Sequence, residues 1–368
     1  MSDRKLSVAV LGSRGIPNRY GGFEACAEKL SALLVRRGHQ VSVYTAADHP
    51  FREEYWQGAK RVIIYNPERI LGSFGQFIYD LLCIRHSRCE DFDIILHLGY
   101  TSDSVWYFLW PKKSIHIVNM DGQEWKRQKY SRPVRAFLRY AEHLATLRSH
   151  WLVADSKKIE TYLNEKYRLP VRYIAYGADI PETFFADVLT EWGLSPGGYD
   201  LIVARMEPEN NIEMAIMAKI NARDKHPLVI AGNANKYKRS LAEKFRHLDQ
   251  IRFIDAVYEE KKINSLRYFS RVYVHGHSAG GTNPSLLEAM ACGCRIVSHR
   301  NPFNELVLGE NAFYYSTQNE LASLFNRYDP GHYDGLIERN LQVIGEEYNW
   351  DAVTLAYEKL FLDAIQAK

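Results

Sequence analysis

Short apolar runs alternate with amphipathic helical stretches through the first half of the chain. The runs are rich in Val, Ile and Leu, which favour strands, whereas the helical stretches repeat apolar residues every three or four positions. The pattern predicts strands at residues 6–12, 40–46, 61–67, 92–99, 114–121 and 150–156, and helices at residues 23–38, 75–86 and 132–149. Such an alternation is typical of βαβ units on a parallel sheet covered on both faces.

The alternation restarts after a connection at residues 171–183 that shows no periodicity. Strands are predicted at residues 201–205, 227–233, 251–257, 271–276 and 294–300, and helices at residues 211–223, 236–248, 260–270, 284–290, 319–328, 333–348 and 350–368. We therefore predict an α/β protein with two doubly wound, Rossmann-like domains facing a cleft, at residues 1–180 and 181–345.

The composition restricts the class of protein to which the chain can belong. The 368 residues are 46% hydrophobic and 25% charged, as in ordinary globular proteins. No apolar stretch approaches the ~20 residues that span a bilayer, and the start has no signal-peptide pattern. The five cysteines include no Cys-x-x-Cys pair, so we expect reduced thiols in a cytoplasmic protein. Cys292 and Cys294 are interpreted as buried small residues, with a metal site as the alternative; no metal is expected.

The overall charge and its distribution bear on partners. A net charge of +3 is too small to indicate nucleic acid, and we expect no such partner. One segment, EWKRQKYSRPVRAFLRYAEH, is strongly basic and aromatic; its cations are Lys126, Arg127, Lys129, Arg132, Arg135 and Arg139. Such a segment suits an anionic membrane surface or anionic ligands, and a solvated helix face is the plain alternative.

The candidate ligand-binding residues lie where predicted strands end, because doubly wound sheets bind ligands there. The loop GSRGIPNRYGGFE follows the first strand, and its Gly21 and Gly22 could bring amide groups close to phosphate at a helix start. The spacing is neither G-x-G-x-x-G nor a Walker pattern, and a tight turn is the alternative. Arg205 leaves the first strand of the second half, well placed to bind a phosphate, with a surface or domain-interface arginine as the alternative.

The segment HGHSAGGTNPSLLEAM, residues 275–290, joins a bare loop to a helix. Asparagine and threonine are good N-caps and proline suits the first helical position, so the positive end of this helix would face an anion such as pyrophosphate. The residues at this helix start are Gly281, Thr282, Asn283, Pro284 and Ser285. Glu288 follows one turn later, where it could accept hydrogen bonds from a ribose; an ordinary charged residue is the alternative.

RMEPENNIEMAI, followed by GGTNPSLLEAMACGCRIVSHRNPFNE, resembles the donor-binding half of the family 4 retaining glycosyltransferases. The resemblance implies a two-Rossmann (GT-B) fold, a nucleotide-sugar donor, no cofactor and usually no metal. It also implies that the C-terminal helix, at residues 346–368, crosses back to the N-terminal domain. The chain departs from the family pattern at two positions. Gly280 stands where an acid is usual, and Asn210, which we include among the donor-binding residues, stands where a lysine is usual.

Three motifs together are similar to a subgroup that includes bacterial rhamnosyltransferases: GSRGIPNRYGGFE, NMDGQEWKR (residues 119–127) and HGHSAGGTNPSLLEAM. This similarity implies transfer of L-rhamnose from dTDP-rhamnose to a lipid-linked saccharide acceptor, during synthesis of cell-surface polysaccharide. Such an enzyme would be cytoplasmic, or peripheral on the inner face of the membrane. A nucleotide-sugar epimerase or hydrolase of the same fold, or a scaffold without activity, are the alternatives.

The roles of individual side chains follow from this reading. Arg205 and the helix start would stabilise the departing pyrophosphate. Asp121 follows a strand on the acceptor side and is the predicted catalytic acid–base residue, with a turn before Gly122 as the alternative. His277 is predicted to contact the donor, as is His275; a structural role is the alternative for both.

Overall fold

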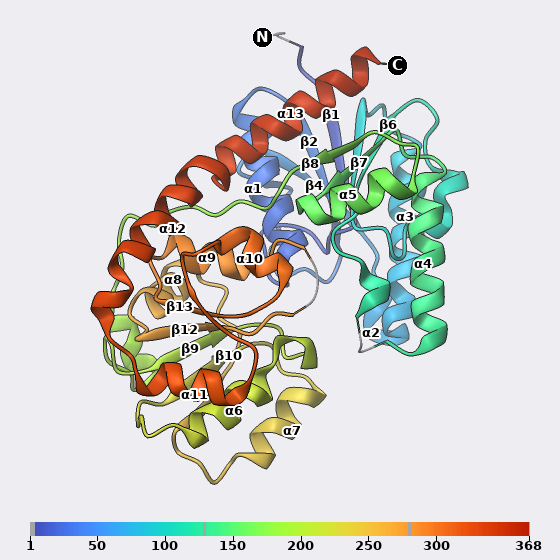
Figure 1. The fold of residues 1–368 in the computed structure, drawn as a ribbon. Helices are drawn as coiled ribbons and strands as arrows, with labels where there is room; N and C mark the ends of the chain where they lie inside the picture. The colour runs from blue at the N-terminus through green and yellow to red at the C-terminus, as the bar shows by residue number, and fades with distance from the viewer. Residues whose placement is uncertain (1–3, 128–129, 279–280, 368) are drawn as a thin grey trace. The chain divides into compact units, whose positions relative to one another are not determined.

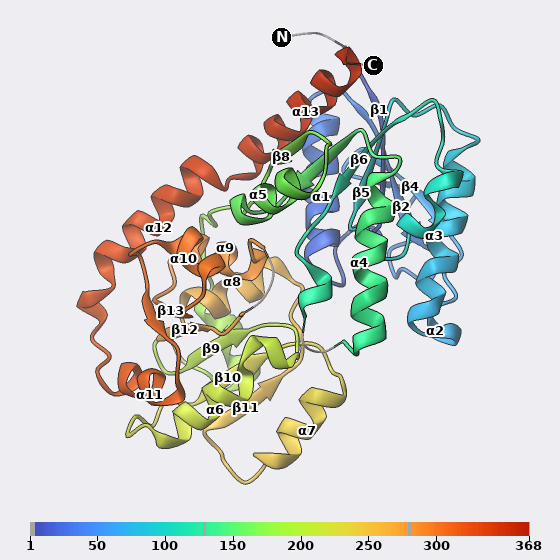
Figure 2. The same cartoon turned by 45° about the vertical axis from the view of Figure 1, so that its right-hand side comes forward.

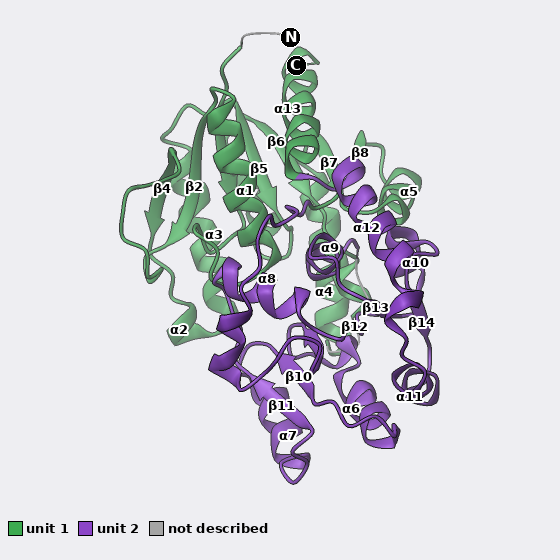
Figure 3. Ribbon diagram, turned by 90° about the vertical axis from the view of Figure 1, so that its left-hand side faces the viewer, with its two compact units in different colours: residues 1–176, 350–368 green, residues 177–349 purple. Residues whose placement is uncertain are grey.

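The computed structural model describes residues 4–127, 130–278 and 281–367, which divide into two compact units (Figure 3). Residues 1–176 and 350–368 belong to the first unit, and residues 177–349 form the second. The chain has the α/β, two-domain GT-B architecture expected from the sequence. Within the described residues, no helix has both the length and the apolar character to cross a membrane.

The first unit is built on a sheet with the strand order β3-β4-β2-β1-β5-β6-β7-β8 in its described part (Figure 1). All neighbours pair in parallel except β3 and β4. The strands are β1 (Ser7–Leu11), β2 (Gln40–Ala46), β3 (Tyr55–Trp56), β4 (Ala59–Ile64), β5 (Ile94–Leu98), β6 (Ile115–Asn119), β7 (Trp151–Ala154) and β8 (Val171–Tyr173). The predicted connection at residues 171–183 was wrong at its start, because β8 pairs with β7 there.

Helices cover the sheet of the first unit. They are α1 (Gly22–Arg36), α2 (Glu68–Leu71), α3 (Ser73–Ser87), α4 (Arg132–Thr146), α5 (Lys157–Lys166) and α13 (Trp350–Gln366). The pattern missed α5, which buries only Ile159 and Leu163 among polar residues. Helix α13 belongs to this unit through specific contacts: Arg37 on the carboxyl end of α1 donates to Glu358, and Asn119 donates to the Tyr357 hydroxyl at 3.1 Å.

The second unit has a parallel sheet with the described strand order β11-β10-β9-β12-β13-β14. The strands are β9 (Asp200–Val203), β10 (Leu228–Ala231), β11 (Ile251–Ile254), β12 (Val272–His275), β13 (Ile296–His299) and β14 (Phe313–Tyr315). From β9 the chain first builds one side of the sheet and then returns to β12 on the other side. The switch point of the sheet therefore lies between β9 and β12.

The helices of the second unit bury apolar faces against this sheet; Ile212, Ile216 and Leu321 are fully buried in its core. They are α6 (Ile212–Asn221), α7 (Lys236–Lys244), α8 (Glu260–Tyr268), α9 (Pro284–Ala291), α10 (Pro302–Leu308), α11 (Gln318–Asn326) and α12 (Asp334–Glu347). Helix α10 was not predicted, since seven residues are too few for a periodic pattern.

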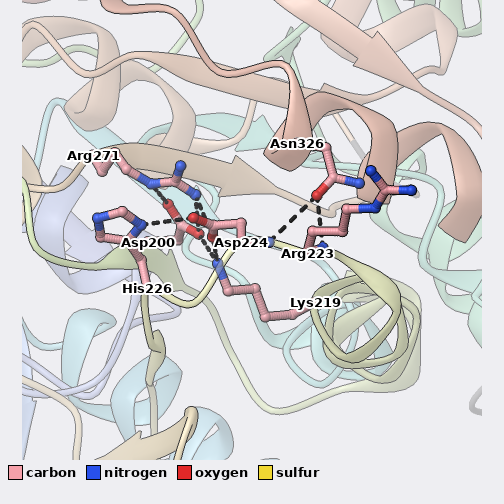
Figure 4. Close-up of polar contacts among 7 residues, drawn as sticks. All are labelled: Asp200, Lys219, Arg223, Asp224, His226, Arg271 and Asn326. Carbon is pink, nitrogen blue, oxygen red and sulfur yellow. Dashed lines mark hydrogen bonds and ion pairs between the residues drawn. The ribbon is translucent and has the colours of Figure 1, made fainter.

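A buried ion network lies at the amino ends of β9 and β12 (Figure 4). Asp200 and Lys219 are fully buried and pair at 2.7 Å, while Arg271 forms two 2.8 Å hydrogen bonds to Asp200. Asp224 closes the network through Lys219, Arg271 and His226. Burial alone would raise the pKa of Asp224, but hydrogen bonds from His226 and Lys219 hold it below its usual value. The network therefore contributes stability at neutral pH that is lost as the pH falls through the aspartate range.

We expect Asp200→Asn to lower the free energy of unfolding by about 3 kcal/mol, because Lys219 and Arg271 then share one carboxylate in a buried site. Urea denaturation at pH 7 measures the change. The control is Glu213→Gln, which removes an exposed partner of Lys244 and should cost at most about 1 kcal/mol. Equal effects of the two substitutions would contradict this role of the network.

Candidate functional site

The loops that follow β9 and β12 meet at the switch point of the second sheet. Asn211 donates its side-chain amide to the Gly276 carbonyl at 2.8 Å, and the Ser278 amide and hydroxyl donate to the Glu209 carbonyl at 3.0 and 2.8 Å. The backbones approach so closely that a Cβ atom on Gly276 would lie 2.1 Å from the Asn210 carbonyl oxygen. Only glycine fits at this position, which directly follows β12.

His277 is buried and is held by the loop that follows β9 and by the start of α10. Its Nδ1 lies 2.8 Å from Asn210 Oδ1, and its carbonyl accepts from the side-chain amides of Asn301 at 2.8 Å and Asn304 at 3.0 Å. Asn210 in turn donates to the Arg205 carbonyl at 2.7 Å, so its oxygen faces the histidine and Nδ1 carries the proton. Asn210 thus links the two loops as a neutral clamp, at the position where the family resemblance suggests a lysine.

Helix α9 begins beside this clamp. Asn283 is its N-cap and accepts the Ser285 amide at 2.9 Å, and Pro284 occupies the first turn, as predicted. The Ser285 hydroxyl donates to the Val203 carbonyl at 2.9 Å and lies 2.7 Å from the Tyr273 hydroxyl, which ties α9 to β9. Thr282 is buried and Gly281 is half-buried. Gly280 lies outside the described residues.

Glu288 lies on α9, one turn from its start, and forms an ion pair with Arg267 on α8. The Arg267 side chain is buried, whereas that of Glu288 is 38% exposed. Burial disfavours the charge of Arg267, but the carboxylate of Glu288 raises its pKa above the ordinary value. This pair fixes the position of a carboxylate that still reaches solvent.

Arg205 and His275 differ sharply in exposure. Arg205 leaves β9 with its side chain exposed to solvent, so a phosphate can reach its guanidinium. His275 ends β12 in a fully buried position, and burial lowers its pKa to about 3. His275 is therefore neutral at physiological pH and supplies no positive charge to an anion.

The predicted residues of the first unit gather at the carboxyl ends of its central strands. Gly21 is the N-cap of α1 in extended conformation, and Gly21 and Gly22 are half-buried. The tight turn after β1 explains why residue 12 is glycine, because a Cβ atom on Gly12 would lie 2.3 Å from the Leu98 carbonyl oxygen. The turn alternative therefore accounts for Gly12, whereas phosphate contact at Gly21 and Gly22 stays a prediction.

Asp121 directly follows the residue after β6 and forms a turn. Its φ of +46° is left-handed, and its amide donates to Asn119 Oδ1 at 2.9 Å. The Tyr176 hydroxyl lies 3.4 Å from Asp121 Oδ1; burial first, and then the charge of Asp121, raises the pKa of this tyrosine. These contacts agree with the turn alternative, and a catalytic role stays a prediction.

The structure brings one predicted set together on the second unit: Arg205, Asn210, His277, Gly281, Thr282, Asn283, Ser285 and Glu288 all lie in the loops and helix at the switch point. Asp121, Gly21 and Gly22 belong to the first unit. Residues that hold the site but were missed include Asn211, Arg267, Gly276, Asn301 and Asn304. The Asn301–Pro302 pair repeats the N-cap signal of Asn283–Pro284 and could have located α10.

The family comparisons agree with this division of the chain. Residues 198–326 match the family model of the glycosyl transferases group 1. This match lies within the second unit. Residues 5–179 match the model of a domain of unknown function (DUF1972). No curated protein sequence matches the chain.

Solved structures share the fold along almost the whole chain. Sucrose-phosphate synthase from Thermosynechococcus elongatus is 16% identical with a TM-score of 0.80, covering 99% of this chain and 100% of its own. Anabaena HepE in complex with UDP and glucose is 15% identical with a TM-score of 0.76, covering 97% and 100%. A glycosyltransferase from Rickettsia africae is 11% identical with a TM-score of 0.71, covering 99% and 100%. At these identities the likeness shows the fold alone.

We expect Gly276→Ala to displace the β9 and β12 loops and to lower the free energy of unfolding by roughly 1–3 kcal/mol, because its Cβ atom would overlap the Asn210 carbonyl. Urea denaturation tests this. Gly345→Ala on α12, where a Cβ atom meets open space, is the control and should be neutral or up to about 1 kcal/mol stabilising. A fully stable Gly276→Ala variant would show that the loops do not pack as described.

Proposed function

We propose that the protein is a retaining, metal-independent glycosyltransferase that binds a nucleotide-sugar donor at the switch point of its second sheet. One observation carries the proposal. Within the region that matches the group 1 glycosyltransferases, hydrogen bonds join the β9 and β12 loops. The exposed Arg205 lies two residues after Val203, whose carbonyl accepts from Ser285 in the first turn of α9. A fixed cation and a helix N-terminus are the groups that stabilise a departing pyrophosphate in the absence of a metal.

In the proposed binding mode, the donor extends from Arg205 across the start of α9 to Glu288. The pyrophosphate lies between the Arg205 guanidinium and the first turn of α9, and the ribose reaches the exposed edge of Glu288. Because Arg267 holds the Glu288 carboxylate in place, little side-chain freedom is lost when the ribose binds. Asn210 and His277 act mainly by holding the two loops at a fixed separation.

The donor and acceptor are proposed from the subgroup resemblance: L-rhamnose from dTDP-rhamnose, moved to a lipid-linked saccharide during cell-surface polysaccharide synthesis. The Anabaena HepE structures hold UDP or UDP-glucose, so a UDP-sugar is the first competing donor. The acceptor hydroxyl would approach from the side of Asp121, which orients it or accepts its proton.

Donor identity and reaction class can be tested in two measurements. A thermal-shift panel of dTDP, UDP and GDP with their sugars identifies the donor, since only a bound ligand raises the melting temperature. Sugar transfer from that donor to a lipid-linked acceptor then tests the activity. Donor turnover without acceptor would point instead to an epimerase or hydrolase. Stabilisation with no turnover of any kind would point to a scaffold.

Arg205→Ala should lower kcat/KM for transfer by about 100-fold or more while the free energy of unfolding changes little, because the exposed guanidinium acts on developing pyrophosphate charge. Steady-state kinetics on the purified variant measure this. Arg246→Ala, which removes an exposed arginine of the same unit, is the control and should leave kcat/KM unchanged. Near-normal transfer by Arg205→Ala would remove this residue from the site.

Glu288→Gln should weaken binding of the free nucleoside diphosphate by about tenfold, because a carboxylate forms stronger hydrogen bonds to a ribose diol than an amide does. It should also cost about 2 kcal/mol of stability through Arg267, less than for a fully buried pair because Glu288 is 38% exposed. Calorimetric titration and urea denaturation separate the two effects. Reduced stability with unchanged nucleotide affinity would restrict Glu288 to a structural role.

A further inference from the structure

Large apolar side chains protrude from the first unit where α2 passes into α3. Ile70, Leu71 and Phe74 are 76%, 45% and 64% exposed, and every residue from Arg69 to Phe74 is exposed. Three such side chains in one short segment are unusual for a surface that faces only water, and clusters of this kind mark interaction sites.

The apolar surface continues onto the first turns of α4. The Phe74 ring stacks on Phe77 with centroids 6.0 Å apart, and Phe77 contacts Phe137 of α4 at 5.8 Å. Val134, one turn before Phe137, is 40% exposed. In Figures 1 and 2, α2 and the amino-terminal end of α4 lie toward the same end of the first unit. The contacts of Phe77 with Phe74 and Phe137 therefore connect the protruding residues at the α2–α3 junction with the first turns of α4.

Cations surround this surface, and the acids near it are engaged. Arg69 and Arg132 are exposed, as are Lys126 and Arg139. The acid of α4, Glu142, is buried and accepts hydrogen bonds from Trp125, Tyr162, Lys166 and Tyr167. Next to Ile70, Glu68 pairs with Arg14, and Asp48 pairs with Arg69. The exposed charge of the α4 face is therefore positive.

Not every residue of the basic segment contributes to this charge. Arg127 is buried in a 2.6 Å ion pair with Glu124, and Arg135 donates its Nε to the Trp125 carbonyl at 2.9 Å. Arg139 and Lys126 lie over the Trp125 ring. Lys129 lies outside the described residues. The segment is thus partly structural, and the exposed apolar residues that complete a binding surface come from α2 and α3.

We infer that this surface docks on an anionic lipid bilayer. We call it the apolar–basic tip; its residues are Arg69, Ile70, Leu71, Phe74, Arg132 and Val134. Protruding aliphatic and aromatic side chains enter the boundary between headgroups and acyl chains, while neighbouring cations meet the lipid phosphates. A nucleic acid would engage the cations but leave Ile70 and Leu71 in water. The inference rests on the proposed function for its purpose, because a lipid-linked acceptor is presented at a membrane.

Sedimentation of the full chain with lipid vesicles tests this inference. The protein should bind vesicles that contain phosphatidylglycerol more tightly than pure phosphatidylcholine vesicles, and high salt should weaken the binding. Ile70→Ser with Phe74→Ser should reduce affinity at least tenfold, because two largely exposed apolar side chains no longer enter the bilayer. Arg132→Gln should also reduce the affinity by about fivefold at low salt, the effect of one cation near the surface.

Matched controls come from the second unit. Leu306→Ser removes an apolar side chain that is 48% exposed, and Arg246→Gln removes an exposed cation; both should sediment as the wild type does. Circular dichroism of the tip variants confirms that they fold. Wild-type protein that does not bind anionic vesicles, or serine variants that bind like the wild type, would overturn the inference. So would a wild-type dimer that the serine variants dissociate, because the tip would then bind a second copy of the chain.

The outcome is separable from that of the proposed function. Vesicle binding is measured without donor, and nucleotide-induced stabilisation is measured without vesicles. The tip variants should keep the wild-type thermal shift with the nucleoside diphosphate, because the tip belongs to the first unit and the donor residues to the second. Tip variants that lose this shift together with vesicle binding would overturn a dedicated membrane role for these residues.

Discussion

The contact between the Gly276 backbone and the Asn210 carbonyl determines the geometry of the candidate site. In a parallel sheet whose order reverses beside its first strand, the loops after β9 and β12 must leave the same edge side by side. Here their backbones touch without an intervening side chain, and Asn210, Asn211 and Ser278 form hydrogen bonds between the two loops. These bonds hold the loop that carries Arg205 against the loop that follows β12, and the Ser285 hydroxyl bond to the Val203 carbonyl holds the start of α9 against the end of β9.

Charged side chains are arranged differently at the amino and at the carboxyl ends of the strands in the second sheet. At the amino edge, Asp200, Lys219, Asp224 and Arg271 satisfy one another inside the protein, so their charges are unavailable to a ligand. At the carboxyl ends of β9 and β12, side-chain amides, hydroxyls and His277 hold the loops together. Arg205, which follows β9, faces solvent. A site for an anionic ligand needs this arrangement, since a cation already paired inside the protein would have to break that pair before binding.

The sequence predicted the elements whose apolar patterns are long, and the structure confirms the two-domain α/β architecture. It missed β8 and β14, which have three residues each, and α10, which has seven, because such short elements show no period. The place of Arg205 and α9 could be predicted, since it follows from counting strands and from the Asn283–Pro284 cap. The clamp between Asn210 and His277 could not, because the partners are 67 positions apart and their contact arises only when both loops reach one edge. The pairing of Glu288 with Arg267 was hidden for the same reason.

Hydrogen–deuterium exchange of the full chain, with and without the nucleoside diphosphate that stabilises it, tests the location of the donor site most directly. The account predicts slower amide exchange in peptides from residues 204–211 and 281–291, which carry Arg205, the clamp and the start of α9. Peptides at the amino edge of the same sheet, residues 222–227 and 268–271, should exchange as in the free protein. Protection confined to that amino edge or to the first unit would contradict the account.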